Sequence, residues 1–221
     1  MKARFFLPLA VLALFAFSVA SISAATVITF DDLHATGSGS FIVNPYHGLT
    51  WSTIQVDNAI LDTNLIAGRH PDIAGGLTGE YYGMASSSNV AALFGSNAFG
   101  IANSEIDSPG TNFNFISAYL TGYWNSNLNI EVQGFRGASL VYSQIVIASA
   151  TSPTLFTFDY LDINRIYFNS FGGQPAFGVS GGEYVSVMDN FTFDLVPEPS
   201  SFLLTGAGVL TLCTFRKRRR A

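Results

Sequence analysis

The chain of 221 residues is 11% charged and carries a formal net charge of −5. Residues 26–195 contain three arginines and 14 of the chain's 15 acidic residues, all except Glu198. This part therefore has a net charge of −11. Such an acidic surface argues against nucleic acid as a partner and favours divalent cations. The single cysteine, Cys213, lies outside this part, which excludes a disulfide, a cysteine nucleophile and a thiolate zinc site there.

Residues 1–25 have the pattern of a secretory signal peptide. A short basic region is followed by an apolar stretch over residues 5–17 and then by small residues. The apolar stretch, about 13 residues long, is shorter than the about 20 residues that a spanning helix needs, which favours cleavage over a retained anchor. Ser23 and Ala25 fit the positions before a cleavage site, so the mature chain is expected to start near Thr26, or one or two residues earlier.

The first part of the exported chain has a weaker pattern than the rest. The segments ATVITF, SFIVN and LTWSTI are candidate strands, and Trp51 alternates into one of them, so we expect it to be buried. Residues 57–112 are dense in Gly, Ser, Asn and Ala, which predicts long loops or a lid over one sheet. A short helical turn is expected near residues 89–94.

From residue 113 onward, short segments rich in β-branched and aromatic residues alternate with polar turns. In LNIEVQGF, Leu128, Ile130 and Val132 face one way while the polar residues between them face the other. Regular strands of this kind predict an all-β fold, an antiparallel β-sandwich of two sheets. No stretch of the mature domain predicts a long amphipathic helix.

The C-terminal end predicts a single transmembrane helix. Residues 202–215 hold no charge, and as a helix they span about 21 Å of a hydrocarbon core of about 30 Å. A thin span is feasible if residues 199–201 extend it and the basic side chains snorkel. By the positive-inside rule, residues 26–199 then lie outside, and the alternative, a basic tail for nucleic acid, fits an exported chain less well. The membrane-flanking basic residues are Arg216, Lys217, Arg218, Arg219 and Arg220.

The motif before this segment carries a family resemblance. Val196, Pro197, Glu198 and Pro199, then the apolar segment, then the arginine-rich end resemble the PEP-CTERM sorting signal of Gram-negative bacteria, over residues 196–221. The resemblance implies recognition by exosortase, a membrane-embedded cysteine transpeptidase-like enzyme, and processing near the Pro-Glu-Pro. Two prolines keep this segment extended and stop the membrane helix from running back into the domain.

A second, looser resemblance covers most of residues 26–195. Five short motifs look like those of the galactose-binding-like jelly-roll domains that often occur in PEP-CTERM proteins: Phe30-Asp31-Asp32-Leu33, Tyr46-His47-Gly48-Leu49-Thr50-Trp51, Gly122-Tyr123-Trp124, Gly134-Phe135-Arg136 and Met188-Asp189-Asn190-Phe191-Thr192-Phe193. Such jelly rolls resemble carbohydrate-binding modules, and many hold a structural calcium between the first and last strands.

Three aspartates are the candidate ligands of such a calcium. Asp31 and Asp32 follow the first strand and Asp189 lies in the last one, and calcium takes six to eight oxygen ligands. The alternative is that these side chains only hydrogen-bond local amides at strand ends. No other cofactor is predicted.

The candidate ligand-binding residues are Tyr81 and Tyr82. Most aromatic residues of a sandwich fill its core, but this pair lies in a Gly-rich segment and can offer its rings to sugars. The three histidines have no paired spacing, and no catalytic motif is present, so no catalytic residue is predicted.

Together these features predict an exported, non-enzymatic protein in three parts: a signal peptide (1–25), a jelly-roll-like sandwich (26–195) and a PEP-CTERM sorting signal (196–221). It would pass through the inner membrane transiently and then reside in the cell envelope, on the outer surface or in the extracellular matrix. Such cargo often accompanies exopolysaccharide and biofilm, so the expected partners are exosortase and exopolysaccharide. The alternatives are a carbohydrate-binding module and, last, a glycan-active enzyme, whose two carboxylates the sequence does not single out.

Overall fold

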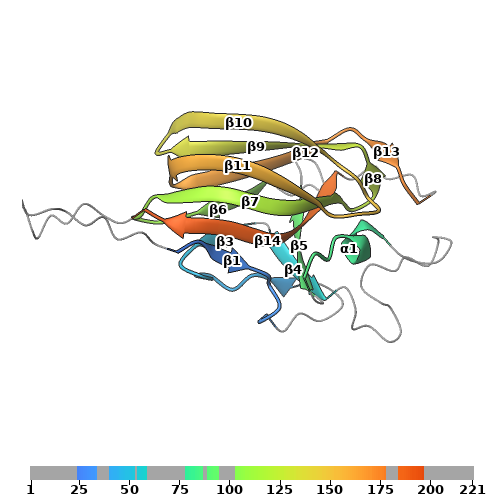
Figure 1. The fold of residues 1–221 in the computed structure, drawn as a ribbon, viewed down its shortest axis with the longest axis horizontal. Coiled ribbons are helices and arrows are strands. Elements are labelled where there is room, and N and C mark those ends of the chain that lie inside the picture. Colours follow the sequence, from blue (N-terminus) through green and yellow to red (C-terminus); the bar gives the residue numbers. More distant parts are fainter. Residues whose placement is uncertain are drawn as a thin grey trace, which may run out of the picture.

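The computed structural model describes residues 24–33, 40–52, 54–58, 78–86, 89–94, 103–177 and 184–196. These residues form two large antiparallel sheets that face each other (Figure 1), which confirms the all-β prediction and the predicted sandwich. Most of the predicted signal peptide and of the predicted sorting signal lies outside these ranges. Within them, no helix is long and apolar enough to span a bilayer.

The larger sheet has seven strands. Its order is β11 (Thr154–Ile163), β7 (Phe113–Gly122), β14 (Val185–Leu195), β5 (Asn89–Phe94), β4 (Ile54–Asn58) and β2 (Ser40–Phe41), with β1 (Thr26–Ile28) paired to β14. The last strand is therefore central, because it contacts both β7 and β5 and also receives the first strand.

The second sheet has five strands. Its order is β10 (Ser139–Ala148), β9 (Leu128–Arg136), β12 (Arg165–Phe171), β6 (Ser104–Asp107) and β3 (Thr50–Ser52). A small ribbon of β13 (Gln174–Pro175) and β8 (Asn125–Ser126) and the short helix α1 (Gly79–Tyr82) complete the described elements. The predicted strand LTWSTI thus divides into β3 and β4, which belong to different sheets.

Phenylalanine rings fill the space between the sheets. Phe115 stacks on Phe158 at 4.7 Å and on Phe191 at 4.8 Å between ring centroids, all on the larger sheet. Phe168 of β12 meets Phe115 edge-on at 6.5 Å, and Trp51 of β3 meets Phe191 at 5.5 Å. All five rings are buried, including Trp51 as predicted, so one aromatic cluster joins the two sheets.

The helical turn expected at residues 89–94 is wrong, because these residues form β5. All six are buried: Ala91 and Leu93 lie in the main core, while Ala92 and Phe94 pack into a second cluster with Val185. A strand covered on both faces does not show polar alternation, so its sequence, NVAALF, looks helical. Among the residues that the structure describes, the helical turn lies earlier, at α1.

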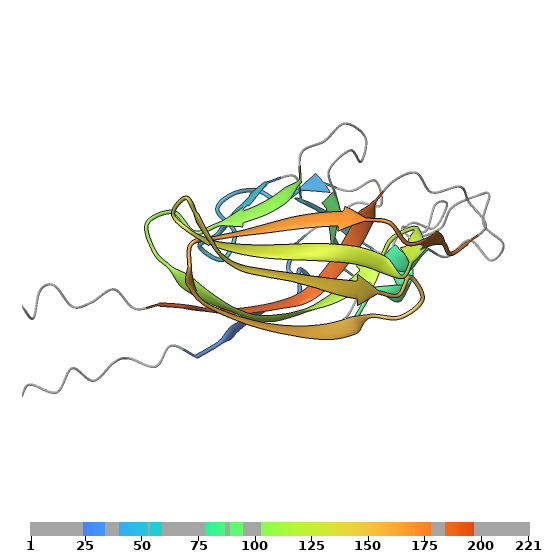
Figure 2. The ribbon, with the colours of Figure 1, turned by 90° about the horizontal axis from the view of Figure 1, so that it is seen from above.

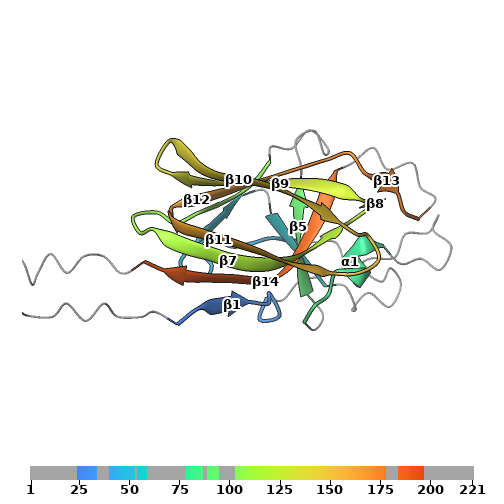
Figure 3. The same cartoon turned by 45° about the horizontal axis from the view of Figure 1, so that its top comes forward.

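The two ends of the described domain lie side by side. Thr26 of β1 pairs with Phe193 of β14, and both strands reach the same end of the sandwich (Figure 2). Helix α1, β8 and β13 lie at the opposite end (Figures 1 and 3). We call these the tail end and the α1 end.

Candidate functional site

Asp189 lies fully buried in β14 and binds a loop from far away in the chain. Its carboxylate accepts the backbone N–H groups of Ala85 (2.7 Å), Ser86 (2.8 Å) and Asn190 (2.7 Å), as well as the Ser86 hydroxyl (3.0 Å). Burial raises the pKa of the Asp189 carboxyl, and these N–H groups oppose that shift. The residue therefore fixes the loop after α1 onto the last strand.

The surroundings of Asp189 do not fit a calcium ligand. Both carboxylate oxygens accept hydrogen bonds from backbone N–H groups, and an N–H group has no lone pair to offer a cation, whereas a carbonyl oxygen has. Among the residues that the structure describes, no group of three or more His, Cys, Asp or Glu side chains is arranged to hold a metal ion. Asp189 is thus not brought together with Asp31 and Asp32 in such a group.

Asp31 lies in a different setting, in the turn that follows β1. Its Oδ1 accepts the N–H of Asn89 at 3.1 Å, and the Asn89 amide donates to the carbonyl oxygens of Phe30 (2.8 Å) and Leu33 (2.7 Å). The Asn89 Oδ1 atom is buried and has no hydrogen-bond partner. The backbone and side-chain N–H groups of Asn89 thus tie the turn after β1 to β5, and the Asn89 Oδ1 atom is the buried oxygen of this group that accepts no hydrogen bond.

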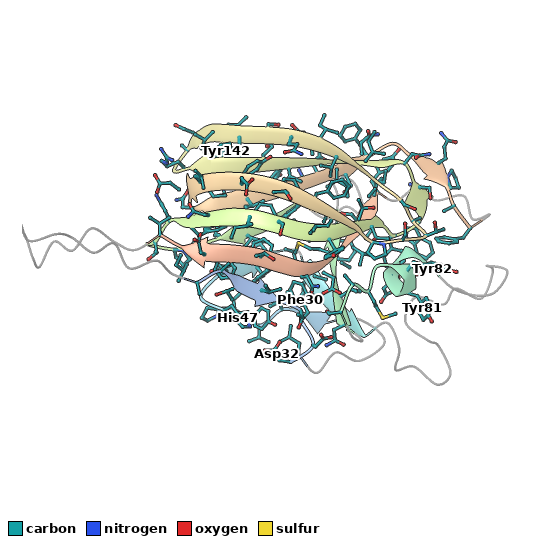
Figure 4. All side chains as sticks on the ribbon, in the orientation of Figure 1. Phe30, Asp32, His47, Tyr81, Tyr82 and Tyr142 are labelled. Carbon is teal, nitrogen blue, oxygen red and sulfur yellow. The ribbon has the colours of Figure 1, made fainter. Side chains whose placement is uncertain are left out.

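Asp32 forms a third, more exposed contact. Its Oδ1 accepts the hydroxyl of Tyr46 at 2.5 Å, and its Oδ2 lies 3.8 Å from Nε2 of the exposed His47 (Figure 4). Burial first, and the hydrogen bond to Asp32 second, raise the pKa of Tyr46. The indole of Trp51 donates to the Tyr46 carbonyl at 3.0 Å. Asp32 thus anchors the loop between β2 and β3.

The predicted pair Tyr81 and Tyr82 lies on α1, at the α1 end (Figure 4). Both rings are partly exposed and meet edge-on at 5.6 Å between centroids. Tyr82 also stacks on Phe177 at 6.1 Å, with 10° between the ring planes. Below them, the buried carboxylate of Glu80 accepts the Tyr123 hydroxyl at 2.6 Å. The pair therefore belongs to an aromatic group at the surface, outside the main core.

A glycine holds α1 in this place. The N–H of Gly79 donates to the Tyr123 carbonyl at 2.9 Å, and a Cβ at position 79 would lie 1.8 Å from the carbonyl oxygen of Gly122. Only glycine allows the helix to approach the end of β7 so closely. A four-residue helix is too short to show periodicity, so the sequence did not predict this arrangement.

The outer face of the five-stranded sheet has a row of polar side chains that the sequence analysis did not single out. Cross-strand pairing aligns Glu105, Tyr167, Gln133 and Ser143 across β6, β12, β9 and β10. Gln133 and Ser143 both donate to a carboxylate oxygen of Glu131, at 2.8 and 3.1 Å. The alternation in LNIEVQGF and INRIYFNS contains this row, because every second residue faces outward.

A shifted carboxyl group lies at one end of the polar row. Burial first, and then the hydrogen bond to Asp107 and repulsion by it, raise the pKa of Glu105 to about 7, while Arg165 opposes the shift. Glu105 therefore keeps its proton to a higher pH than an ordinary glutamate does. The guanidinium of Arg165 also lies over the ring of Phe135, 4.6 Å from its centroid.

The predicted sorting motif is described only at its first residue. The N–H of Val196 donates to the carbonyl oxygen of Asn112 at 2.9 Å, directly after β14 ends. Pro197, Glu198, Pro199 and the basic residues from Arg216 to Arg220 lie outside the described residues, as does the apolar segment between them.

Comparison with known proteins adds little. No protein-family model matches the chain, and no curated protein matches it. A DUF4465 family protein from Bacteroides caccae is similar in structure, with 8% sequence identity and a TM-score of 0.49 over 77% of this chain and 98% of that one. A DUF4465 family protein from Bacteroides ovatus has 5% identity and a TM-score of 0.39 over 78% and 99%. Likenesses this weak carry no argument about function.

Asp189→Asn is expected to destabilise the protein by about 2 kcal/mol, because an amide places an NH₂ group against backbone donors that then remain buried and unpaired. The free energy of unfolding from denaturant titration measures this loss. Asp159→Asn on β11 is the matched control, since Asp159 is exposed and asparagine tolerates its φ of 51°. Equal losses in the two variants would contradict the role given to Asp189.

Proposed function

We propose that this chain is an exported, non-enzymatic protein of the cell envelope or extracellular matrix of a Gram-negative bacterium, sorted by exosortase through a PEP-CTERM signal at residues 196–221. The observation that carries the proposal is the order of Pro-Glu-Pro, apolar segment and arginine cluster on a chain that begins with a signal peptide. The resemblance links such cargo to exopolysaccharide and biofilm, so the molecular role is adhesion or matrix structure.

The position of the tail in the fold supports this proposal. β14 ends at Leu195, and Val196 is the last described residue, so the sorting motif follows the domain without a spacer. Because β1 and β14 pair, both ends of the domain lie at the tail end (Figure 2). A precursor held in a membrane by its tail would present the α1 end, with Tyr81 and Tyr82, away from that membrane.

The strand order supports a jelly roll as the finer description of the sandwich. In chain order, eight strands pair in a nested way: β5 with β14, β6 with β12, β7 with β11, and β9 with β10, all antiparallel. One long hairpin rolled into two sheets gives this nesting, which is the double Greek key of a jelly roll. Strands β1 to β4 are additions to that framework.

The sorting proposal is tested by the C-terminus of the protein in its native host. Replacement of Pro197-Glu198-Pro199 by alanines is expected to block processing, so that the variant stays in the membrane fraction with its arginine cluster, while the wild type ends near Pro199. Mass spectrometry of the C-terminal peptide after cell fractionation measures both. Mutation of Pro175 to Ala, outside the tail, is the control and should be processed like the wild type. A wild type that retains residues 216–221 would overturn the proposal and leave a plain anchor.

A structural calcium remains part of the proposal, near Asp31 rather than Asp189. The residues that would hold it are Asp31 and Asn89, and the unpaired Asn89 Oδ1 supports this choice; the carbonyl oxygens of Phe30 and Leu33 would join them only if the Asn89 amide group, which now donates to both, turned its oxygen toward them. Such an ion would tie the turn after the first strand to β5.

Calcium at 100 times its dissociation constant is expected to stabilise the wild type by about 2.7 kcal/mol. The midpoint of thermal unfolding, with and without a chelator, measures this effect. Asp31→Asn should abolish the response to calcium, and Asp189→Asn should keep it although its basal stability is lower. A wild type whose midpoint does not respond to calcium would rule the site out.

Carbohydrate binding is the second candidate function, and a glycan-active enzyme comes after it. The partly exposed rings of Tyr81 and Tyr82, supported by Phe177, favour binding, because sugars offer apolar C–H faces to aromatic rings. The nearby Glu80 carboxylate is occupied by Tyr123 and is buried, which suits a supporting role.

The variant Tyr82→Ala is expected to lower affinity for the host's exopolysaccharide about tenfold, equivalent to about 1.4 kcal/mol. Isothermal titration with size-fractionated exopolysaccharide measures the affinity. Tyr142→Ala is the matched control, because this partly buried tyrosine lies toward the tail end (Figure 4). Saturable binding that survives both Tyr81→Ala and Tyr82→Ala would place the glycan elsewhere on the domain.

A further inference from the structure

Strand β10 forms an open edge of the five-stranded sheet. It is ten residues long, lies at the rim of the sandwich (Figure 1) and, within the described part of the chain, is hydrogen-bonded to β9 alone. Its pairing with β9 has one register shift, between Leu140 and Tyr142, and then runs without interruption from Tyr142 to Ala148. The backbone groups on its other side are therefore available to another strand.

The other described edges of the two sheets are protected in the ways that proteins commonly use. β2 and β3 are only two and three residues long. β11 is as long as β10, but two register shifts interrupt it, and it carries Asp159 and Asp162, both with positive φ. Of these four edge strands, β10 is the one that keeps a regular register over seven consecutive residues.

The side chains of β10 add to this contrast. The strand has no charged residue and no proline, although the domain carries a net charge of −11. Its exposed apolar side chains are Leu140 (51%), Val141 (42%), Ile145 (56%) and Ile147 (60%). Apolar surface and free backbone groups thus coincide on one strand, which is the combination that favours strand addition.

We propose that β10 pairs antiparallel with β10 of a second copy of this chain, so that two five-stranded sheets join across a two-fold axis. A second copy fits better than an unstructured peptide, because its strand is already extended and loses little conformational freedom on pairing. It also fits the charge, since two domains of −11 repel each other wherever acidic residues meet, and β10 brings none to the contact. A two-fold pairing closes on itself and leaves no further open end of this kind.

Disulfide cross-linking in the full chain tests the pairing. In a Cys213→Ser background, single cysteines replace Ser143, Ile145 or Ile147 on β10, and cells of the host are treated with a mild oxidant. Antiparallel pairing should link two copies strongly at the one position nearest the two-fold axis and weakly at the others. Leu155→Cys and Leu161→Cys on β11, with similar exposure of 51% and 55%, are the controls.

Two results would overturn the proposal. Cross-linking at the β10 positions that does not exceed that at Leu155 and Leu161 means that no such contact forms. Equal cross-linking at all three β10 positions means parallel pairing, since each residue then faces its own copy.

A second measurement does not depend on cysteine chemistry. Ile145→Lys places like charges across the proposed interface, so light scattering on the purified protein should give half the mass found for the wild type. Leu161→Lys is the matched control and should keep the dimer mass. A monomeric wild type, or a dimeric Ile145→Lys variant that remains folded, would contradict the pairing.

Discussion

The contact on which the structure depends is the aromatic cluster around Phe115. Rings stack along the larger sheet from Phe158 through Phe115 to Phe191, and Phe168 and Trp51 reach this stack from the second sheet. Residues 26–195 contain no cysteine, so no disulfide stabilises this part of the chain. Burial of these rings takes that role, and it also sets the spacing of the two sheets.

The sequence predicted the strands that have one buried and one exposed face. β9 and β12 show this most clearly, because their alternation comes directly from a core on one side and water on the other. Prediction from the sequence failed for β5, which is covered on both faces. It also failed for α1, whose position depends on a close approach of Gly79 to Gly122. Local sequence patterns indicate which residues are buried, but they do not indicate which distant segments of the chain come into contact.

The candidate sites show the same limit. Asp31, Asp32 and Asp189 are recognisable in the sequence as acidic residues near the first and last strands, but their partners come from elsewhere in the chain. Asp189 accepts hydrogen bonds from residues 103 and 104 positions away, and Asp31 from a residue 58 positions away. The Asp189 carboxylate is buried among donors from a distant loop, while Asp31 lies beside the unpaired Asn89 Oδ1 atom, and only the fold distinguishes these settings. The outward direction of the side chains in the polar row could have been predicted, because apolar and polar residues alternate along these strands.

The pairing of β1 with β14 brings both ends of the domain to one end of the sandwich, and this has a directional consequence for the dimer proposed at β10. A two-fold axis that makes neighbouring strands antiparallel turns one copy end over end, so the two tails point in opposite directions. Copies standing on the same membrane cannot meet in this way. The pair instead spans a gap, with one tail directed to each of two surfaces, and its length along the strands would set how far apart those surfaces are held.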